Sequence, residues 1–491
     1  MGVVLGVDVG TSSTKGVLVD LSGRVVATAV REHDVSRPRP GWVEMDAEVW
    51  WDEFVSIARE LVATTQENVV AVGVSGMGPC VALADGDGVP LRPAILYGVD
   101  TRATQQIARL TAELGADEIL ARGGSALSTQ AAGPKIAWVA ENEPAVFGAA
   151  RKVFMPASFL AYRLSGAYVL DHQSASQCSP LYDSVAQEWY WPWAGPIVGD
   201  IELPPLVWSD SIVGTVTSTA AAATGLPVGT PVVSGTIDAW TEAVSVGAQQ
   251  PGDLMLMYGT TMFLVNTISD RITIPELWGT VGAFEGTRNL AGGMATSGAI
   301  TGWLRGLVGS PDYPTLLAEA AASGPGAHGL LMLPYFAGER TPIADPDARG
   351  VIAGLTIEHT RGDLYRAALE ATALGVRHNV EAIRAAGGSI ERVGAGGGGT
   401  QGDHWLHVVS DVTGLTQEVR SVTIGASYGA AFLAARAVAS VSIDEWNPVQ
   451  RMVEPDAALA ASYDELYALY RDLYPSTAAV MHALAERQRE S

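Results

Sequence analysis

The sequence predicts an α/β protein of two domains, each built around a mixed sheet. The chain has 491 residues, which is more than one hydrophobic core normally organises. Its first part reads as three short strands, a helix and a fourth strand, so strands and helices alternate from the start. A strand, a glycine–hydroxyl turn and a second strand return about 250 residues later, which indicates that the domain is repeated.

The composition excludes several classes of protein. The chain is 48% hydrophobic and 17% charged, which is typical of a globular protein. Its formal net charge of −23 argues against nucleic acid and anionic membranes as partners, because both bind basic surfaces. The two cysteines, Cys80 and Cys178, cannot build a disulfide framework or a cysteine-rich metal site, and we expect both to be reduced and buried. With neither a secretory signal nor an uncharged stretch of ~18 apolar residues, a soluble cytoplasmic protein is expected.

The first turn of the chain combines a glycine, hydroxyl groups and a carboxylate. An apolar strand that begins at Val3 ends in Asp8, a polar loop runs from Gly10 to Lys15, and a second apolar run follows. Glycine lets the backbone approach a ligand closely, and backbone N–H groups and hydroxyls can hold phosphate oxygens. Asp8 could hold a hard cation beside them. An ordinary hairpin with a polar tip is the alternative for this loop taken alone.

The elements after this hairpin follow from their periodicity and their end signals. Residues 24–35 predict a third strand, which completes an antiparallel meander. Apolar residues at helical spacing predict a helix over 46–62, with Asp46 as its N-cap. The β-branched run 69–75 is typical of a buried parallel strand, and the loop Gly76–Pro79 leaves it sharply.

Asp238 follows another apolar strand, predicted over residues 228–234, and precedes a predicted helix. A carboxylate at the carboxyl end of a strand is well placed for chemistry in an α/β sheet. It could accept the proton of an attacking hydroxyl, or at least orient that hydroxyl. The alternative is a helix N-cap, a position that Asp prefers equally. The sequence does not decide between the two.

The second half repeats the opening motif without its carboxylate. A strand over 253–258, the turn Gly259–Thr261 and a strand over 262–265 match the first hairpin, and the boundary between the halves is expected at 246–252. Long helices are predicted over 362–386 and over the alanine-rich run 426–439, which could pack closely. Two such turns indicate phosphate binding, and the repeat would place them face to face across a cleft. Neither contains the Walker pattern of a P-loop ATPase.

A glycine run near the end of the chain allows a different nucleotide. Gly394-x-Gly396-x-x-Gly399 matches the dinucleotide fingerprint, and Glu418 falls about where a ribose-binding acid would lie. This alternative is an NAD-dependent oxidoreductase. Against this alternative, the run follows only a short strand, and four consecutive glycines satisfy many patterns. A glycine-rich strand end beside a helix N-terminus also suits the face of an adenosine pocket.

Taken together, the chain resembles the FGGY carbohydrate kinases, most closely the xylulokinase and related pentulose kinase branch. The resemblance covers roughly residues 3–440. The motifs that carry it are Asp8-Val9-Gly10-Thr11-Ser12, Gly41-Trp42-Val43-Glu44 before Trp50-Trp51, Pro134-Lys135, Asp238, Gly259-Thr260-Thr261, Gly338-Glu339-Arg340-Thr341-Pro342 and Gly397-Gly398-Gly399. In this context the Gly338–Pro342 segment is close to diagnostic of the family.

The resemblance implies two actin-like (ribonuclease H-like) domains, over residues 1–247 and 248–491, with sugar and ATP in the cleft between them. It implies ATP-dependent phosphorylation of a hydroxyl of a ketose, a pentulose such as xylulose, with Mg²⁺ as cofactor. By position Asp238 would be the catalytic base and Asp8 would act on Mg²⁺. The residues implied for ATP and its phosphates are Thr11, Ser12, Lys15, Gly259, Thr260, Thr261, Gly302, Gly397, Gly398 and Gln401. Those implied for the sugar are Met77, Gly78, Asp100, Arg102, Trp240 and Asp238.

Departures from the family pattern fall on the sugar side. Xylulokinases usually carry Gln-Met-His where this chain has Met77-Gly78-Pro79, and their Trp-Asn-Asp-x-Arg segment is one residue longer here, at Tyr97–Arg102. Trp240 stands where a small residue or Asn is usual. The acceptor could therefore be ribulose, a tetrulose, a hexulose or a glycerol-like polyol. A non-catalytic actin-like ATP-binding protein is a further alternative, and a homodimer is left open.

Overall fold

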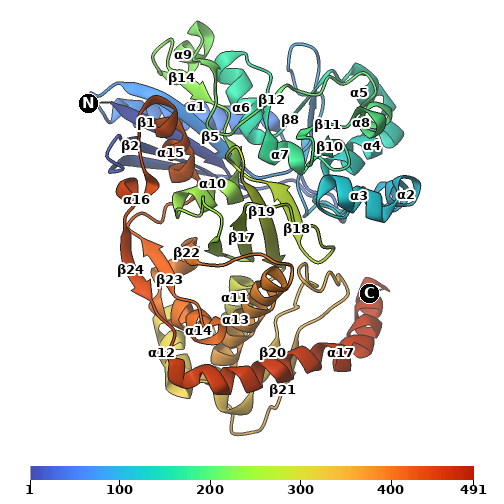
Figure 1. The fold of residues 1–491 in the computed structure, drawn as a ribbon, viewed down its shortest axis with the longest axis vertical. Helices are drawn as coiled ribbons and strands as arrows, with labels where there is room; N and C mark the ends of the chain where they lie inside the picture. The colour runs from blue at the N-terminus through green and yellow to red at the C-terminus, as the bar shows by residue number, and fades with distance from the viewer. Residues whose placement is uncertain (1, 491) are drawn as a thin grey trace. The chain divides into compact units, whose positions relative to one another are not determined.

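The computed structural model describes residues 2–490 and divides into two compact units. The first unit comprises Met1–Pro251, Thr267–Asn289 and Ile424–Pro448, and the second comprises Gly252–Asn266, Leu290–Thr423 and Val449–Ser491. Each unit has a sheet with helices packed against it, so the predicted two-part α/β architecture is confirmed (Figure 1). Among residues 2–490, no helix is both long and apolar enough to cross a bilayer.

The sheet of the first unit is mixed and has the strand order β13-β14-β5-β1-β2-β3, with β15 also paired to β5. β1 pairs antiparallel with β2 and parallel with β5, as the predicted meander and the parallel strand require. The strands are β1 (Val3–Val9), β2 (Ser13–Asp20), β3 (Val25–Glu32), β5 (Val69–Gly76), β13 (Ile212–Thr215), β14 (Pro231–Val233) and β15 (Thr236–Ile237). β14 begins three residues later than predicted, because the Thr230 N–H bonds to the Pro227 carbonyl in a turn and Gly229 has a positive φ.

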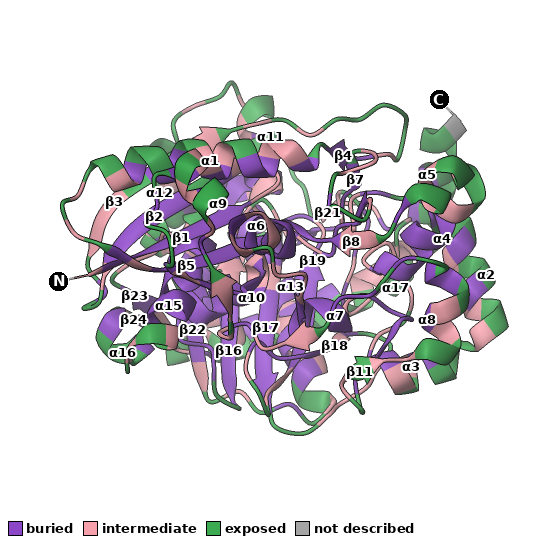
Figure 2. Cartoon of the chain, turned by 90° about the horizontal axis from the view of Figure 1, so that it is seen from above, coloured by how far each residue is buried: buried purple, intermediate pink, exposed green. Residues whose placement is uncertain are grey.

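Helix α1 (Ala47–Ala63) shows why the first sheet is covered as the sequence predicts. The Asp46 side chain accepts a hydrogen bond from the Glu48 N–H at 3.0 Å and caps the helix. Trp50, Phe54 and Ile57 are fully buried on one side of the helix, and its other side is exposed (Figure 2). β1 is buried along its whole length.

Other helices of the first unit surround this core. They are α2 (Thr104–Leu114), α3 (Ala116–Gly123), α4 (Ala132–Asn142), α5 (Pro144–Ala149), α6 (Pro156–Ser165), α7 (His172–Ser176), α8 (Trp191–Val198), α9 (Ser218–Thr224), α10 (Asp238–Ser245), α15 (Ala426–Val438) and α16 (Ile443–Trp446). Short strand pairs join β4 (Glu44–Met45) to β7 (Ala94–Ile95), β6 (Ala82–Ala84) to β8 (Lys152–Phe154), β9 (Leu170–Asp171) to β12 (Leu206–Val207), and β10 (Tyr182–Asp183) to β11 (Glu188–Trp189).

Helix α15 lies against β1, β5 and α10, although it comes more than 300 residues after those strands in the sequence (Figure 1). Two glycines allow this. A Cβ at Gly73 would overlap the Ala430 carbonyl, and a Cβ at Gly429 would overlap the Thr241 carbonyl. The alanine-rich helix therefore packs closely, as predicted, and its backbone supports the helix that carries Asp238.

The second unit repeats the strand–turn–strand motif around its own sheet. β16 (Asp253–Tyr258) pairs antiparallel with β17 (Met262–Ile268) and parallel with β22 (Arg392–Gly396), so this sheet is mixed as well. β19 (Arg288–Met294), β17, β16, β22, β23 (Gln417–Arg420) and β24 (Val449–Val453) follow one another in it. The remaining elements here are α11 (Gly298–Leu307), α12 (Tyr313–Ser323), η1 (Ala327–Gly329), β20 (Leu331–Leu333), β21 (Val351–Ala353), α13 (Arg361–Ala385), η2 (Gly398–Gln401), α14 (Asp403–Thr413), η3 (Ala457–Leu459) and α17 (Ala460–Glu490). β18 (Trp278–Val281) lies within the segment Thr267–Asn289, which is part of the first unit.

Candidate active site

Three strands of the first sheet end side by side, and each end carries a polar side chain. Asp8 of β1 is paired with Ser75 of β5, and Ser75 is in turn paired with Thr236 of β15. Asp238 follows β15 directly and begins α10. Parallel strands present their carboxyl ends at one edge of a sheet, so the register brings Asp8, Ser75 and Asp238 to the same edge.

A short hydrogen-bond chain links these residues. Ser75 Oγ donates to Asp8 Oδ1 at 2.9 Å and lies 2.6 Å from Thr241 Oγ1. Thr241 Oγ1 is also 2.9 Å from the carbonyl oxygen of Asp238. The Asp238 carboxylate accepts from the N–H of the next residue, Ala239, at 2.8 Å. Since Ile237 occupies the N-cap of α10, the N-cap alternative for Asp238 is not what the structure shows.

Burial keeps a proton on both carboxyl groups at higher pH than usual. Burial, and to a smaller extent the nearby charge of Asp8, together raise the pKa of Asp238 to about 7. Burial raises the pKa of Asp8 to about 6, against the opposing effects of the Ser75 hydroxyl and the Lys15 charge. A carboxylate whose pKa lies near neutral pH can take a proton from a hydroxyl and release it again under ordinary conditions.

The first hydroxyl loop is held in a tight turn. The Gly10 N–H donates to the Ser13 carbonyl at 3.0 Å, and Thr11 Oγ1 lies 2.8 Å from the Tyr97 hydroxyl. Ser12 is exposed, and Lys15 stands opposite Asp8 in the register of β1 and β2. The loop thus presents a glycine, hydroxyls and an ammonium group next to Asp8, as its sequence predicts.

His33 supports this loop from behind, a role that sequence reasoning missed. Its Nε2 is 3.0 Å from the Gly10 carbonyl oxygen, and its Nδ1 is 2.9 Å from Glu53 Oε2. Its backbone N–H donates to the Ser12 carbonyl at 3.1 Å, and Thr14 Oγ1 donates to the same Glu53 oxygen at 2.5 Å. A carbonyl can only accept, so His33 Nε2 donates this hydrogen bond to Gly10.

Three residues predicted for the sugar lie close to Asp238 in the chain or in space. The Met77 N–H donates to the Val9 carbonyl at 2.8 Å, which fixes the loop after β5. A Cβ at Gly78 would lie 2.7 Å from Ile237, the residue before Asp238. Trp240 is buried, and its indole N–H donates to Asn289 Oδ1 at 3.0 Å.

Asp100 and Arg102 form a buried ion pair instead of pointing into open space. Two guanidinium nitrogens of Arg102 contact the Asp100 carboxylate, at 2.7 and 3.0 Å, and a third contacts Glu44 at 2.7 Å. The Asp100 carboxylate also accepts from the Val43 N–H at 2.6 Å and from the Arg102 backbone N–H at 3.0 Å, and Arg102 stacks on the Trp42 ring at 4.1 Å. The side chains of Asp100 and Arg102 are fully buried, so the pair fixes the Trp42–Val43 turn.

The second hydroxyl loop lies in the second unit, between β16 and β17. The Gly259 N–H donates to the Thr261 carbonyl at 3.1 Å, and the N–H groups of Ser297 and Gly298, where α11 begins, donate to the Thr260 and Gly259 carbonyls at 3.0 Å each. These helix N–H groups are already engaged, so the loop's own N–H groups and hydroxyls are what it can offer a ligand. The Ser297 hydroxyl is buried and has no hydrogen-bond partner within residues 2–490.

The glycine run of the second unit lies beside Tyr258 at the end of β16. Gly397 has φ +83°, and a Cβ there would lie 2.5 Å from the Tyr258 carbonyl oxygen. A Cβ at Gly398 would have no described atom within 4 Å, and Gly302 on α11 is likewise open. The Gln401 amide donates to Thr423 Oγ1 at 3.1 Å. The residues predicted for ATP thus form two groups in this unit, one at the hydroxyl loop and one at the glycine run.

The sequence matches one protein family over most of its length. Residues 3–245 match the N-terminal domain of the FGGY family of carbohydrate kinases, and residues 254–438 match its C-terminal domain. The chain is 29% identical over 490 residues to a xylulose kinase of Escherichia coli, covering 97% of this chain and 99% of that protein. It is 30% identical over 464 residues to a glycerol kinase of Nocardia farcinica, covering 89% and 90% respectively.

A solved structure agrees with these sequence matches. The crystal structure of xylulose kinase from Rhodospirillum rubrum is similar with a TM-score of 0.91 and 33% sequence identity, over 98% of this chain and 100% of that chain. Likeness in fold and in sequence over the full length together identifies the family to which both belong.

Proposed function

Because the chain belongs to the FGGY family of carbohydrate kinases, we propose that it transfers the γ-phosphoryl group of ATP to a hydroxyl of a five-carbon ketose such as xylulose. The similarity to xylulose kinases in sequence and in structure supports a pentulose as acceptor. The observation that carries the proposal is Asp238, a half-buried carboxyl group at the strand edge whose pKa desolvation raises to about 7.

Asp238 serves as the base in this reaction. Its carboxylate accepts the proton of the sugar hydroxyl while the hydroxyl oxygen forms a bond to the γ-phosphorus, and the bond from that phosphorus to the β,γ-bridging oxygen breaks to release ADP. Ser75 and Thr241 hold Asp8 and the start of α10 in place during this step. Phosphoryl transfer depends mainly on such positioning and on stabilising charge.

Mg²⁺ fits beside Asp8. Asp8 is buried and Asp238 half-buried, and desolvation favours the neutral form of both carboxyl groups, so a divalent cation would stabilise both as carboxylates. Within residues 2–490 there is no group of three or more ligating side chains, which agrees with a cation that keeps waters and phosphate oxygens as ligands. When bound, Mg²⁺ would offset negative charge on the phosphate oxygens.

ATP is assigned to the two hydroxyl loops and the glycine run. Thr11, Ser12 and Lys15 would contact phosphate oxygens from the first unit, and Gly259–Thr261 from the second. Gly302, Gly397, Gly398 and Gln401 are assigned to the adenosine. The cleft between the domains stays a prediction of the resemblance. An enzyme that consumes ATP is assigned to the cytoplasm.

For the sugar, the structure supports two kinds of role. Met77, Gly78 and Trp240 are proposed to contact it, because Gly78 packs against Ile237, Met77 precedes Gly78 in the same loop, and Trp240 follows Asp238 by two residues. Asp100 and Arg102 are proposed to act indirectly, since their side chains are fully occupied with each other, Glu44 and the Val43 N–H.

A polyol such as glycerol is the second candidate acceptor. The similarity to a glycerol kinase and the Met77–Pro79 loop, which lacks the His usual in xylulokinases, favour it. Release of ADP with D-xylulose, D-ribulose, L-erythrulose, D-fructose and glycerol, with NAD⁺ reduction followed in parallel, separates the candidates. D-Xylulose is expected to give the highest kcat/KM. ATP binding without ADP release from any acceptor, or NAD⁺ reduction, would overturn the proposal.

A further inference from the structure

Lys135 of α4 is a buried cation that the reaction described above does not use. Lys135 is only 1% exposed, and its ammonium group has no hydrogen-bond partner within residues 2–490. Burial lowers the pKa of Lys135 to about 8, so the group is still mostly charged at neutral pH. Buried charges are normally paired, because an unpaired charge away from water is strongly unfavourable.

No acceptor among residues 2–490 is hydrogen-bonded to this ammonium group. Asp100 attracts Lys135, and Arg102 repels it. The Asp100 carboxylate is already engaged by Arg102 and by the Val43 N–H, so it makes no hydrogen bond to Lys135. A group that only donates hydrogen bonds is therefore left without an acceptor.

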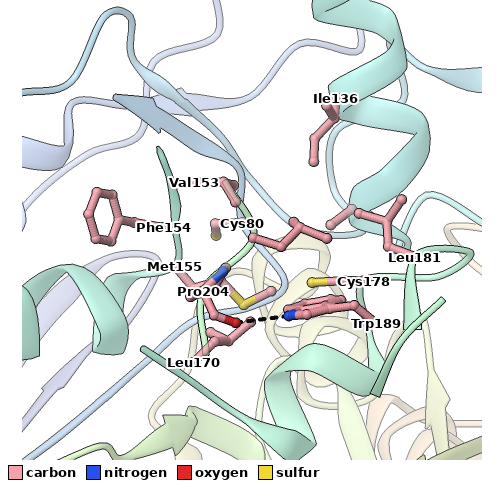
Figure 3. A pocket seen from close by; sticks show the side chains of 12 residues that line it. Cys80, Ile136, Val153, Phe154, Met155, Leu170, Cys178, Leu181, Trp189 and Pro204 are labelled. Atoms are coloured by element: carbon pink, nitrogen blue, oxygen red, sulfur yellow. Dashed lines mark hydrogen bonds between the residues drawn. The ribbon is translucent and has the colours of Figure 1, made fainter. Parts of the chain in front are cut away.

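The ammonium group lies near the loop that follows β5. Its charge acts on the thiols of Cys80 and Cys178, which line one small cavity of about 10 Å³ (Figure 3). That cavity is mostly apolar and has room for about one water molecule, so it is not itself a sugar site. Cys80 Sγ is 3.5 Å from the Met77 carbonyl oxygen, so it belongs to the loop assigned to the sugar.

The charge of Asp238 also acts on the thiol of Cys80 in this loop. Burial is the main cause that raises the pKa of the Cys80 thiol to about 12. The charge of Lys135 lowers this pKa, and the charge of Asp238 raises it. Cys80 therefore lies within electrostatic reach of both groups. An acceptor whose reacting hydroxyl meets Asp238 and which passes along residues 77–80 would present its other end to Lys135.

We propose that Lys135 donates a hydrogen bond to the carbonyl oxygen of the ketose and so selects acceptors that carry such an oxygen. This inference rests on the proposed function. A carbonyl oxygen only accepts hydrogen bonds, so it satisfies the ammonium group without bringing a donor that needs a partner of its own. A charged donor strengthens this bond. A polyol offers only hydroxyls at the same place, and the carboxylate of a sugar acid offers the same acceptor chemistry with a full charge.

Kinetics with three five-carbon acceptors test the assignment. D-Xylulose carries a carbonyl, xylitol carries none, and D-xylonate carries a carboxylate. With the wild type, KM for xylitol is expected to exceed KM for D-xylulose by about tenfold or more. Lys135→Met, which keeps the length of the side chain, is expected to raise KM for D-xylulose by about tenfold and to remove this preference, with KM for ATP unchanged. Lys152→Met removes a lysine elsewhere in the first unit and should change neither constant.

Two results would overturn the inference. If Lys135→Met raises KM for D-xylulose and xylitol by the same factor, or raises neither, the ammonium group does not bind the carbonyl oxygen of the ketose. If the wild type prefers D-xylonate to D-xylulose, its partner is a carboxylate. A wild type that turns over none of the three acceptors instead overturns the proposed function, which keeps the two failures apart.

A second measurement needs no variant protein to be active. The chain has only three lysines, Lys15, Lys135 and Lys152, so lysine labelled with ¹³C at the ε-carbon gives three side-chain signals. Lys→Arg variants assign them. D-Xylulose added without ATP is expected to shift the Lys135 signal and leave Lys152 in place. A Lys135 signal unmoved at saturating D-xylulose would contradict the contact, whatever the kinetics show.

Discussion

Asp8 and Asp238 are joined through Ser75 and Thr241, and the charge of Asp8 helps to raise the pKa of Asp238. Two carboxyl groups that are shielded from water and lie this close together disfavour each other's negative charge. The competition suits a site in which one group acts on a cation and the other takes a proton. Each role makes a separate prediction.

Asp238→Asn should abolish proton transfer and leave nucleotide binding intact. An amide cannot accept the proton of the hydroxyl, so kcat is expected to fall by about 10²–10⁴, the usual contribution of a general base. The dissociation constant of ATP should stay within about threefold, measured by calorimetry, because that side chain contacts no proposed ATP residue. Turnover close to that of the wild type would remove Asp238 from the role of base.

The raised pKa of Asp238 also predicts how stability depends on pH. The unfolded carboxyl group loses its proton near its ordinary pKa of 3.8, and the folded one holds it to about 7. Between these values the folded state binds more protons, so this group destabilises the fold increasingly as pH rises from 4 to 7. Asp238→Asn should therefore raise the Tm of the unliganded protein by about 2–4 °C at pH 8 and hardly at all at pH 4. Asp52→Asn, on the exposed side of α1, is the control, and an equal gain from both variants at pH 8 would contradict the explanation.

The sequence predicted where strands end, but not which side chains on neighbouring strands and loops contact one another. Asp8, Asp238 and Gly259–Thr261 could be found because each adjoins an apolar run that ends in polar residues. Ser75 and His33 could not, because their partners Asp8 and Gly10 are set by strand register and chain path.

Other differences have the same kind of cause. Asp100 and Arg102 stand two residues apart, and nothing in that spacing shows that the two side chains form a fully buried ion pair. The alanine-rich composition of α15 predicted close packing, which the structure confirms. Its position on the sheet of the first unit depends on the tertiary fold, which no local pattern encodes.

Asp8→Asn should weaken the dependence of turnover on Mg²⁺. Removing the carboxylate charge is expected to raise the Mg²⁺ concentration for half-maximal rate by at least about tenfold, and Ser75→Ala, which loses the hydroxyl that orients Asp8, should have a smaller effect in the same direction. A Mg²⁺ titration of ADP release measures both. An unchanged requirement in Asp8→Asn would assign the cation elsewhere.

His33 should affect ATP more than the sugar. His33→Leu removes the donor to the Gly10 carbonyl and leaves Glu53 with Thr14 as its remaining partner, so the first hydroxyl loop loses its support. Two lost hydrogen bonds of about 1 kcal/mol each predict a rise of about tenfold or more in KM for ATP, with KM for the sugar unchanged. His407→Leu, an exposed histidine on α14, is the control. If KM for both substrates rises together, His33 supports the fold in general and not the loop.

Gly429→Ala should show how strictly α15 holds α10. The added methyl would overlap the Thr241 carbonyl, so one of the two helices must move. Overpacking of this kind predicts a loss of about 1–3 kcal/mol in the free energy of unfolding, measured with urea. Gly148→Ala on α5, where an added Cβ meets no described atom within 4 Å, should instead gain about 0.5–1 kcal/mol. Because Thr241 and Asp238 share α10, Gly429→Ala should also lower kcat at a pH where the protein stays folded, and equal stability of the two variants would show that the contact yields without strain.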